Sequence, residues 1–254
     1  MQRGRELFQN RGRQKKERFT FLRLPTQVNI CFGGEVNLPN LARLTMLSTY
    51  VRYSEHLGRD DNILVVGQTK SQRPMRKKDM REVLQLSQKS FSTFFADMVK
   101  AGALLPLADK SFAINSNLFF RGKVPTGATG KYTTGTVAKV FADRYRLLFR
   151  SNLKDVKEIG LVLRLAPFIS RHYDVLCHDP YESDINVVRR LSMTDICRLV
   201  GMDVSHASRY RRRLEEKFAD IAFEYNGTTH NLCTVREHSN GKKFIHVNPS
   251  VISF

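Results

Sequence analysis

The run LSMTDICRLVGMDVS, residues 191–205, has the pattern of a helix, a tight turn and the start of a second helix. Ser192 and Asp195 have the spacing of a capping box, in which each side chain accepts a hydrogen bond from the other residue's backbone amide. Ile196 and the apolar residues after it recur at helical spacing and form one buried face. Gly201 permits the tight turn, because glycine tolerates a positive φ. The run predicts a helix-turn-helix.

The helix that follows, residues 205–218, has two different faces. Ala207, Tyr210, Leu214 and Phe218 recur at the spacing of a buried stripe, and most of the other side is basic. In a helix-turn-helix the N-terminal part of this helix enters the major groove, where arginine bonds both acceptors of guanine. An ordinary solvated basic face is the alternative. The residues predicted to contact DNA are Ser205, His206, Ser208, Arg209, Arg212 and Arg213.

Two Asn-Gly pairs, at residues 226–227 and 240–241, predict hairpins after this helix. Asn-Gly is a strong hairpin signal because both central positions of a type I′ turn need a positive φ. The flanking apolar runs predict a wing with strands over 221–225, 231–237 and 243–247. Its basic residues are expected to contact phosphate, namely Arg236, Lys242 and Lys243.

The first half of the sequence has a similar order. A helix is predicted from residue 38 to 51, and residues 78–101 follow the pattern helix, break, helix, with Ser87 as an N-cap. A hairpin over 103–114 comes next, and both halves end in an apolar strand, an asparagine and a turn. The outward residues of this second helix are predicted to bind DNA weakly or to form a dimer surface: Gln88, Lys89, Ser90 and Thr93.

These patterns predict a mainly α fold with small β-hairpin wings (α+β), built as two tandem winged helix-turn-helix units. The second half is expected to open with a helix over 137–148 and a second over 159–176, interrupted at Pro167. The predicted divisions are a basic arm (1–18), an N-terminal winged-helix domain (19–120), a Gly/Thr-rich linker (121–135) and a C-terminal winged-helix domain (136–254).

Composition indicates the class of partner. The chain has 42 Lys and Arg against 24 Asp and Glu, a formal charge of +18, so it needs an anionic partner.

No apolar run approaches the length of a membrane span, and no signal peptide is evident, so we expect a cytoplasmic protein. The four cysteines lack CxxC spacing. His and Cys cluster near residues 172–178 and 230–238, but we expect no metal and no cofactor.

The string from Lys78 to Val124 resembles winged-helix replication proteins of plasmids and phages from Gram-positive bacteria. In these proteins the hairpin ends in Ile-Asn-Pro-x-hydrophobic-hydrophobic. Here the ending is Ile114-Asn115-Ser116-Asn117-Leu118, with serine in place of proline, whereas Val247-Asn248-Pro249-Ser250-Val251 keeps the proline. The resemblance covers less than half of the chain. It implies origin recognition, strand opening by recruited host proteins, and no catalysis by the initiator.

Two other functions fit parts of the pattern. A winged-helix transcriptional regulator of a phage or mobile element differs from an initiator only in where it binds. Among enzymes, a rolling-circle nickase needs His-x-His, which the sequence lacks, and a recombinase needs dispersed Arg and His with a late tyrosine. Tyr210 is predicted to face inward. We therefore expect a non-catalytic protein that binds double-stranded DNA and host replication or transcription proteins, with a homodimer through its N-terminal domain.

Overall fold

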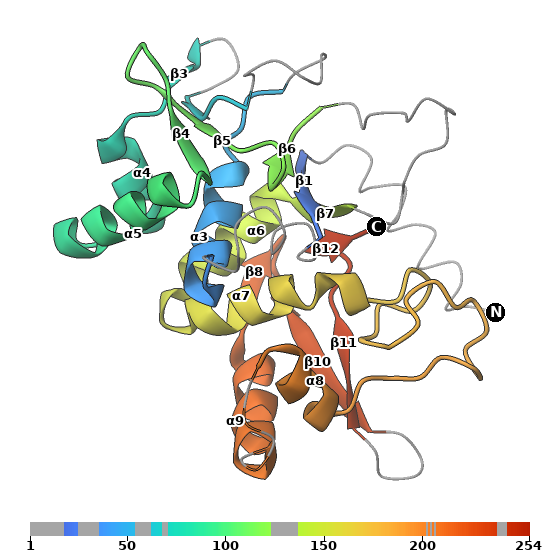
Figure 1. The fold of residues 1–254 in the computed structure, drawn as a ribbon. Coiled ribbons are helices and arrows are strands. Elements are labelled where there is room, and N and C mark those ends of the chain that lie inside the picture. The colour runs from blue at the N-terminus through green and yellow to red at the C-terminus, as the bar shows by residue number, and fades with distance from the viewer. Residues whose placement is uncertain are drawn as a thin grey trace.

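A four-stranded antiparallel sheet joins the two halves of the protein (Figure 1). The computed structural model describes residues 18–24, 36–53, 62–67, 71–122 and 137–254, except 202, 204, 206 and 238–242. The sheet has the strand order β12-β7-β1-β6, and its central pair, β1 and β7, aligns Phe19 with Phe141 and Arg23 with Val137. The strands are β1 (Phe19–Arg23), β6 (Phe119–Phe120), β7 (Val137–Phe141) and β12 (Ile252–Ser253).

Among its described residues, the first half places three helices and two small hairpins between β1 and β6. The first of these helices is capped by the side chain of Asn37, which accepts from the Asn40 amide at 2.9 Å, and it has a proline in its first turn, where no amide partner is needed. The elements are α3 (Leu38–Ser48), β2 (Val65–Val66), β3 (Arg73–Pro74), α4 (Lys77–Leu84), α5 (Gln88–Lys100), β4 (Leu104–Pro106) and β5 (Phe112–Ile114).

The second half runs from β7 to β12 and carries four helices and two hairpins among its described residues. The elements are α6 (Ala142–Ser151), η3 (Leu153–Asp155), α7 (Val156–Arg164), η4 (Ala166–Phe168), α8 (Met193–Leu199), α9 (Ala207–Asp220), β8 (Ala222–Tyr225), β9 (Thr228–Asn231), β10 (Cys233–Glu237) and β11 (Lys243–Val247). β8 pairs with β9 and β10 with β11, each pair antiparallel.

The hydrophobic core is continuous through both halves. Its centre is the contact of α3 with α7, which cross in the middle of Figure 1. Gly160 of α7 makes this approach possible, because a Cβ on it would lie 1.9 Å from the Leu38 carbonyl oxygen. The fully buried Tyr145 of α6 donates its hydroxyl to the Ala42 carbonyl at 3.0 Å. The two halves therefore pack backbone against backbone.

The segment that follows the last hairpin makes the same hydrogen bonds in both halves. Asn115 donates its side-chain amide to the Gly102 carbonyl at 2.9 Å, and its side-chain oxygen accepts from the Asn117 amide at 2.9 Å. Asn248 repeats both bonds, to the Asn231 carbonyl and from the Ser250 amide, each at 2.9 Å. In each half the asparagine's carbonyl then accepts from the third and fourth residues that follow it. The similarity of the two endings in the sequence thus has a structural counterpart.

The backbone hydrogen bonds just before each helix pair, α4–α5 and α8–α9, are repeated as well. The Leu64 amide donates to Phe112 and the Leu64 carbonyl accepts from Met75. The Leu176 amide likewise donates to Ile245, and its carbonyl accepts from Leu191. One residue after Met75 and one after Leu191, an aspartate in the first turn caps the next helix: Asp79 accepts from the Arg76 amide, and Asp195 accepts from the Ser192 amide. At Ser192 the bond is reciprocal and completes a capping box.

The prediction of a mainly α fold made of two tandem winged helix-turn-helix units is wrong. The structure is a mixed α/β fold with seven α-helices and several small antiparallel sheets among the described residues. The largest error concerns Val137–Phe141, which is a central strand and not the start of a helix. Its apolar residues fit helical spacing, but in a strand they also supply the two sheet faces, Ala138 and Val140 on one and Phe141 on the other.

Two further expectations are corrected. The helix expected over 159–176 ends at Arg164, and a 3-10 turn surrounds Pro167, since proline removes a helical hydrogen bond and clashes with the preceding turn. The wing expected after α9 is two separate hairpins, because Leu232 breaks the strand that was predicted over 231–237.

Several local predictions are confirmed. Ser87 caps α5, Ser192 and Asp195 form a capping box, and Gly201 has φ +70°. Asn226 and Gly227 both have a positive φ, as a type I′ turn requires.

Some predictions fall outside the described residues. These are the basic arm except Arg18, the linker beyond residue 122, and the turn at 240–241. The domain boundaries stay a prediction. Among the described helices, none has the length and hydropathy needed to cross a membrane.

Candidate nucleic-acid interface

The pair α4 and α5 is held at both starts by side-chain caps. Asp79 accepts from the Arg76 amide at 2.8 Å and forms a two-pronged ion pair with Arg73, at 2.7 and 2.8 Å. The hydrogen bond from Arg73, followed by the bond from the Arg76 amide, holds the pKa of Asp79 below its ordinary value. Ser87 then accepts from the Ser90 amide at 3.2 Å. Arg81 of α4 donates to Gln88 in the first turn of α5, and this bond ties the start of α5 to α4.

The exposed face of α5 carries the four residues predicted from the sequence. Phe91, Phe94 and Met98 are buried, so the other side of the helix faces solvent. The exposed residues are Gln88, Lys89, Ser90 and Thr93. Three of them have local partners. Gln88 accepts from Arg81, Ser90 pairs with the Ser87 hydroxyl at 3.0 Å, and Thr93 donates to the Lys89 carbonyl at 3.3 Å. Lys89 has no ion pair with any described carboxylate.

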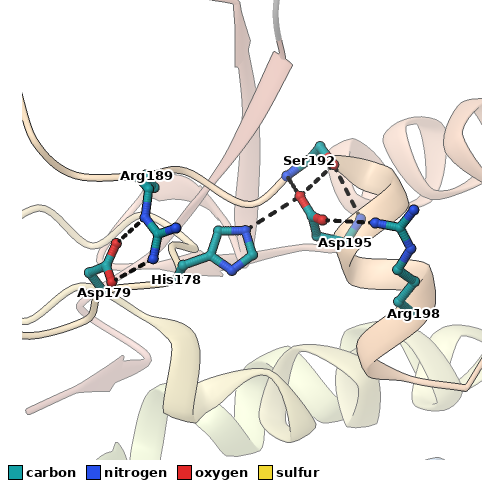
Figure 2. A network of polar contacts seen from close by, with 6 residues as sticks. All are labelled: His178, Asp179, Arg189, Ser192, Asp195 and Arg198. Atoms are coloured by element: carbon teal, nitrogen blue, oxygen red, sulfur yellow. Dashed lines mark hydrogen bonds and ion pairs between the residues drawn. The ribbon is translucent and has the colours of Figure 1, made fainter.

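The start of α8 is the centre of a polar network that Figure 2 shows from close by. Asp195 accepts from the Ser192 amide at 2.9 Å and from the Ser192 hydroxyl at 2.6 Å. His178 approaches the same carboxylate at 3.5 Å and Arg198 at 3.6 Å. The bonds from Ser192, aided by His178, hold the pKa of Asp195 below its usual range. The chain before α8 is thereby anchored to the helix.

α9 is the second helix of this pair, and its backbone is helical from Ala207 to Asp220. The predicted contact Ser205 is exposed, and its amide donates to the Asp203 side chain at 2.8 Å. Arg212 is exposed and lies 3.7 Å from Glu216. Phe218 is buried, as predicted. His206 and the side chains of Ser208, Arg209 and Arg213 lie outside the described residues.

The hairpin β10–β11 carries the remaining predicted contacts. Arg236 is exposed on β10. Lys243, at the start of β11, donates to Glu215 of α9 at 2.8 Å, so it ties the hairpin to the helix. Lys242 lies outside the described residues.

The predicted residues form two sets and not one continuous surface. In Figure 1, α5 lies at the upper left and α9 at the bottom, with α3 and α7 between them. A linear ligand that contacts both sets would have to run along the molecule.

A third basic surface was missed in the sequence. Two adjoining cavities, of 510 and 660 Å³, share Lys77, Lys78 and Phe95 in their walls. We call this surface the basic groove and define it by Arg76, Lys77, Lys78, Arg81, Phe95, Pro106, Leu107 and Lys110. One carboxylate, Asp109, lines the same wall and accepts from the Ser111 amide and hydroxyl, and Gln88 of α5 borders the groove. The signal was the Arg-Lys-Lys run at 76–78, which looked like part of a polar connection.

The described part of the chain contains no cluster of three metal-ligating side chains. Cys177, Cys197 and Cys233 are buried free thiols, and burial raises the pKa of each, so they stay protonated at neutral pH. Thiolate chemistry is therefore not favoured at these three positions.

Comparison with known proteins adds no assignment. No protein-family model, no curated protein and no solved structure matches the chain.

Proposed function

We propose that the protein is a cytoplasmic, non-catalytic protein that binds double-stranded DNA in a sequence-specific way. The observation that carries the proposal is the repeated arrangement of α4 with α5 and of α8 with α9. In each pair a capped helix is followed by a second helix; α5 begins in solvent-exposed polar residues, and Ser205, which is exposed, comes just before α9. A chain with a formal charge of +18 supplies the matching electrostatics.

The two helices have different roles in this proposal. Arg209 and Arg213 of α9 are assigned to base reading, because arginine forms paired hydrogen bonds with guanine in the major groove. Lys89 of α5 and Arg236 of β10 are assigned to phosphate contact, which positions the protein without reading sequence. Gln88, Ser90 and Thr93 supply shorter polar groups beside Lys89, and they suit contacts to phosphate or to base edges.

Origin binding is the first form of the proposal, because the segment from Lys78 to Val124 resembles replication initiators. In that form the protein occupies repeats beside an AT-rich stretch and recruits host replication proteins. A transcriptional regulator, which would recruit or exclude host transcription proteins, is the second form. The two differ in the location of the sites.

The test is selection of bound fragments from the source genome and its mobile elements at ~0.15 M salt, with Arg209→Ala/Arg213→Ala as the control. Enrichment of one cluster of repeats beside an AT-rich stretch supports an initiator, and sites scattered among promoters support a regulator. Equal recovery with the wild type and the double variant overturns base reading by α9.

Catalysis is tested separately with Tyr210→Phe, which removes the hydroxyl that a recombinase would use as its nucleophile. The proposal expects unchanged DNA binding and no covalent DNA adduct from either protein. A covalent adduct that the wild type forms and the variant does not would overturn the non-catalytic assignment.

A further inference from the structure

The basic groove combines positive charge with an apolar floor. Lys77 and Lys78 are exposed at the start of α4, and neither has an ion pair with a described carboxylate. Phe95 lies beneath Lys77, whose ammonium is 4.3 Å from the ring centroid. Pro106 and Leu107 extend the apolar floor along the β4–β5 hairpin. A ligand that fills the groove must bring both negative charge and apolar surface.

A loop in the other half of the chain has the complementary composition. We call residues 179–187 the docking loop. Its exposed apolar side chains are Tyr181, Ile185 and Val187, with relative exposures of 63%, 41% and 57%. Glu182 and Asp184 lie between them, and among the described residues neither has an ion pair. Exposed apolar side chains grouped on one loop are typical of an interaction surface.

The docking loop is held in a defined shape. Arg189 clamps Asp179 through two hydrogen bonds of 2.8 and 3.0 Å at the base of the loop, as Figure 2 shows. The neighbouring His178 contacts Asp195 of α8 at 3.5 Å. At the tip, Asp184 accepts from the Asn186 amide at 2.9 Å. A loop that is already ordered loses little conformational entropy when it docks, which favours binding.

The groove and the loop cannot meet within one molecule as it is folded. In Figure 1, α4 and α5 lie at the upper left, whereas the orange segment before α8, which contains the loop, lies at the lower right. A contact between them therefore joins two copies of the chain.

We propose that the protein associates head to tail, with the docking loop of one copy seated in the basic groove of the next. Glu182 and Asp184 meet Lys77 and Lys78, while Ile185 and Val187 cover Phe95 and Leu107. The contact is heterologous, because it joins two different surfaces, so it leaves one groove and one loop free at the ends and allows chains of copies. This association differs from the homodimer predicted from the sequence, in which two copies would meet only through their N-terminal domains.

The apolar floor favours a protein segment over nucleic acid as the occupant. Phe95 packs on Phe91 and Phe112 on its inner side, and its outer side lines the groove beside Pro106 and Leu107. A phosphate backbone would satisfy the lysines but would leave this outer apolar surface uncovered. The docking loop supplies both chemistries from one short segment.

The experiment is sedimentation velocity without DNA at ~0.15 M salt over a range of protein concentrations. The groove variant is Lys77→Glu/Lys78→Glu, and the loop variant is Ile185→Asp/Val187→Asp. Lys154→Glu/Lys157→Glu is the matched control, since it makes the same charge change at two exposed lysines elsewhere. Circular dichroism and thermal melting verify that each variant is folded.

We expect the wild type and the control to associate as concentration rises, and each of the other variants to associate at least about tenfold more weakly. An equimolar mixture of the groove and loop variants should form a dimer and nothing larger, because only one of its two possible contacts is intact.

Several results would overturn the proposal. One is a wild type that stays monomeric up to about 1 mM, the range in which even weak contacts become populated. Others are a control as impaired as the groove variant, and a mixture that forms no dimer. A groove variant that associates normally but binds DNA more weakly would assign the groove to nucleic acid.

Discussion

The two halves of the molecule share an internal framework and differ in the surface it carries. Asn115 and Asn248 make matching hydrogen bonds, and the aspartate caps of α4 and α8, Asp79 and Asp195, follow matching backbone contacts. The exposed face of α5 has short polar side chains and one lysine in its first two turns, whereas the sequence of α9 has four arginines within residues 209–213, of which Arg212 is described and exposed. The comparison indicates that the partly buried asparagine bonds and the helix caps are shared by the two halves, whereas the sequences of the second helices differ.

The second half has a hairpin between its second helix and its last hairpin, and the described residues 101–103 between α5 and β4 hold no equivalent. β8 and β9 lie between α9 and β10, and the side chain of Asn152 on the α6 side donates to the Ala222 carbonyl at 2.7 Å. Arg144 of α6 lies over the Tyr225 ring at 4.7 Å. The extra hairpin therefore packs on α6 and supports α9 from one side, an arrangement without an equivalent at α5.

The largest expected effect is at the contact that joins the halves. Gly160→Ala places a Cβ against the Leu38 carbonyl oxygen, a backbone atom that cannot rotate away. We expect α3 and α7 to separate and the free energy of unfolding to fall by about 3 kcal/mol or more. Urea unfolding measures this change. A loss under about 1 kcal/mol would contradict the close approach of the two helices.

The asparagine pair tests whether the two halves are equivalent. Asn115→Ala and Asn248→Ala each remove a partly buried donor and acceptor and leave a backbone carbonyl and an amide without their partners. We expect each to cost about 1–3 kcal/mol, with similar values at the two positions. Chemical denaturation of both variants checks this. A large cost at one position and none at the other would break the equivalence.

The capping carboxylates should give smaller and pH-dependent effects. Asp79→Asn and Asp195→Asn each weaken an aspartate cap at the start of a helix, at a cost of about 0.5–1 kcal/mol because both groups are partly solvated. The pKa of each carboxyl is lowered in the folded protein, so the contribution is complete above about pH 5 and is lost as the pH falls through the lowered pKa. Stability measured from pH 7 to 3 should show the variants converging on the wild type. A difference in stability between variant and wild type that stays constant from pH 7 to 3 would contradict the assignment of these carboxylates as charged helix caps.

The smallest effect on stability is expected at Lys243. Its ion pair with Glu215 is partly exposed, so Lys243→Ala should cost less than about 1 kcal/mol of stability. Under the proposed function the same change weakens binding to all DNA sequences alike, because it removes a positive charge beside the phosphates. Thermal melting and DNA titration of one sample separate the two effects. A loss confined to one DNA sequence would contradict a phosphate role.

Local signals predicted the individual elements better than their assembly. Caps and turns at Ser87, Ser192, Gly201 and Asn226 depend on neighbouring residues, so the sequence reveals them directly. The central sheet was missed because its pairing depends on contacts between residues about 120 positions apart, such as Phe19 with Phe141. Short apolar runs like Val137–Phe141 fit both a helix and a strand, and only the tertiary partner decides between them.

The candidate interface was predictable to a similar degree. The exposed face of α5 follows from helical spacing, and the structure has Gln88, Lys89, Ser90 and Thr93 exposed. The pairing of Lys243 with Glu215 was not predictable, because it needs the packing of the β10–β11 hairpin against α9, which is made mainly through β10. The basic groove was missed for the same reason, since its walls come from α4, α5 and the β4–β5 hairpin.

The most direct test of DNA binding through α5 and α9 is the affinity for an enriched fragment, measured from ~0.05 to 0.3 M salt. The wild type is compared with Lys89→Ala/Thr93→Ala on α5 and Arg209→Ala/Arg213→Ala on α9. If about six phosphates are neutralised, the logarithm of the binding constant should fall with a slope of about −5 against the logarithm of salt concentration. The α9 variant should lose discrimination between specific and random DNA, and the α5 variant should lose affinity for both. A flat salt dependence, or two variants that bind as the wild type does, would contradict the account.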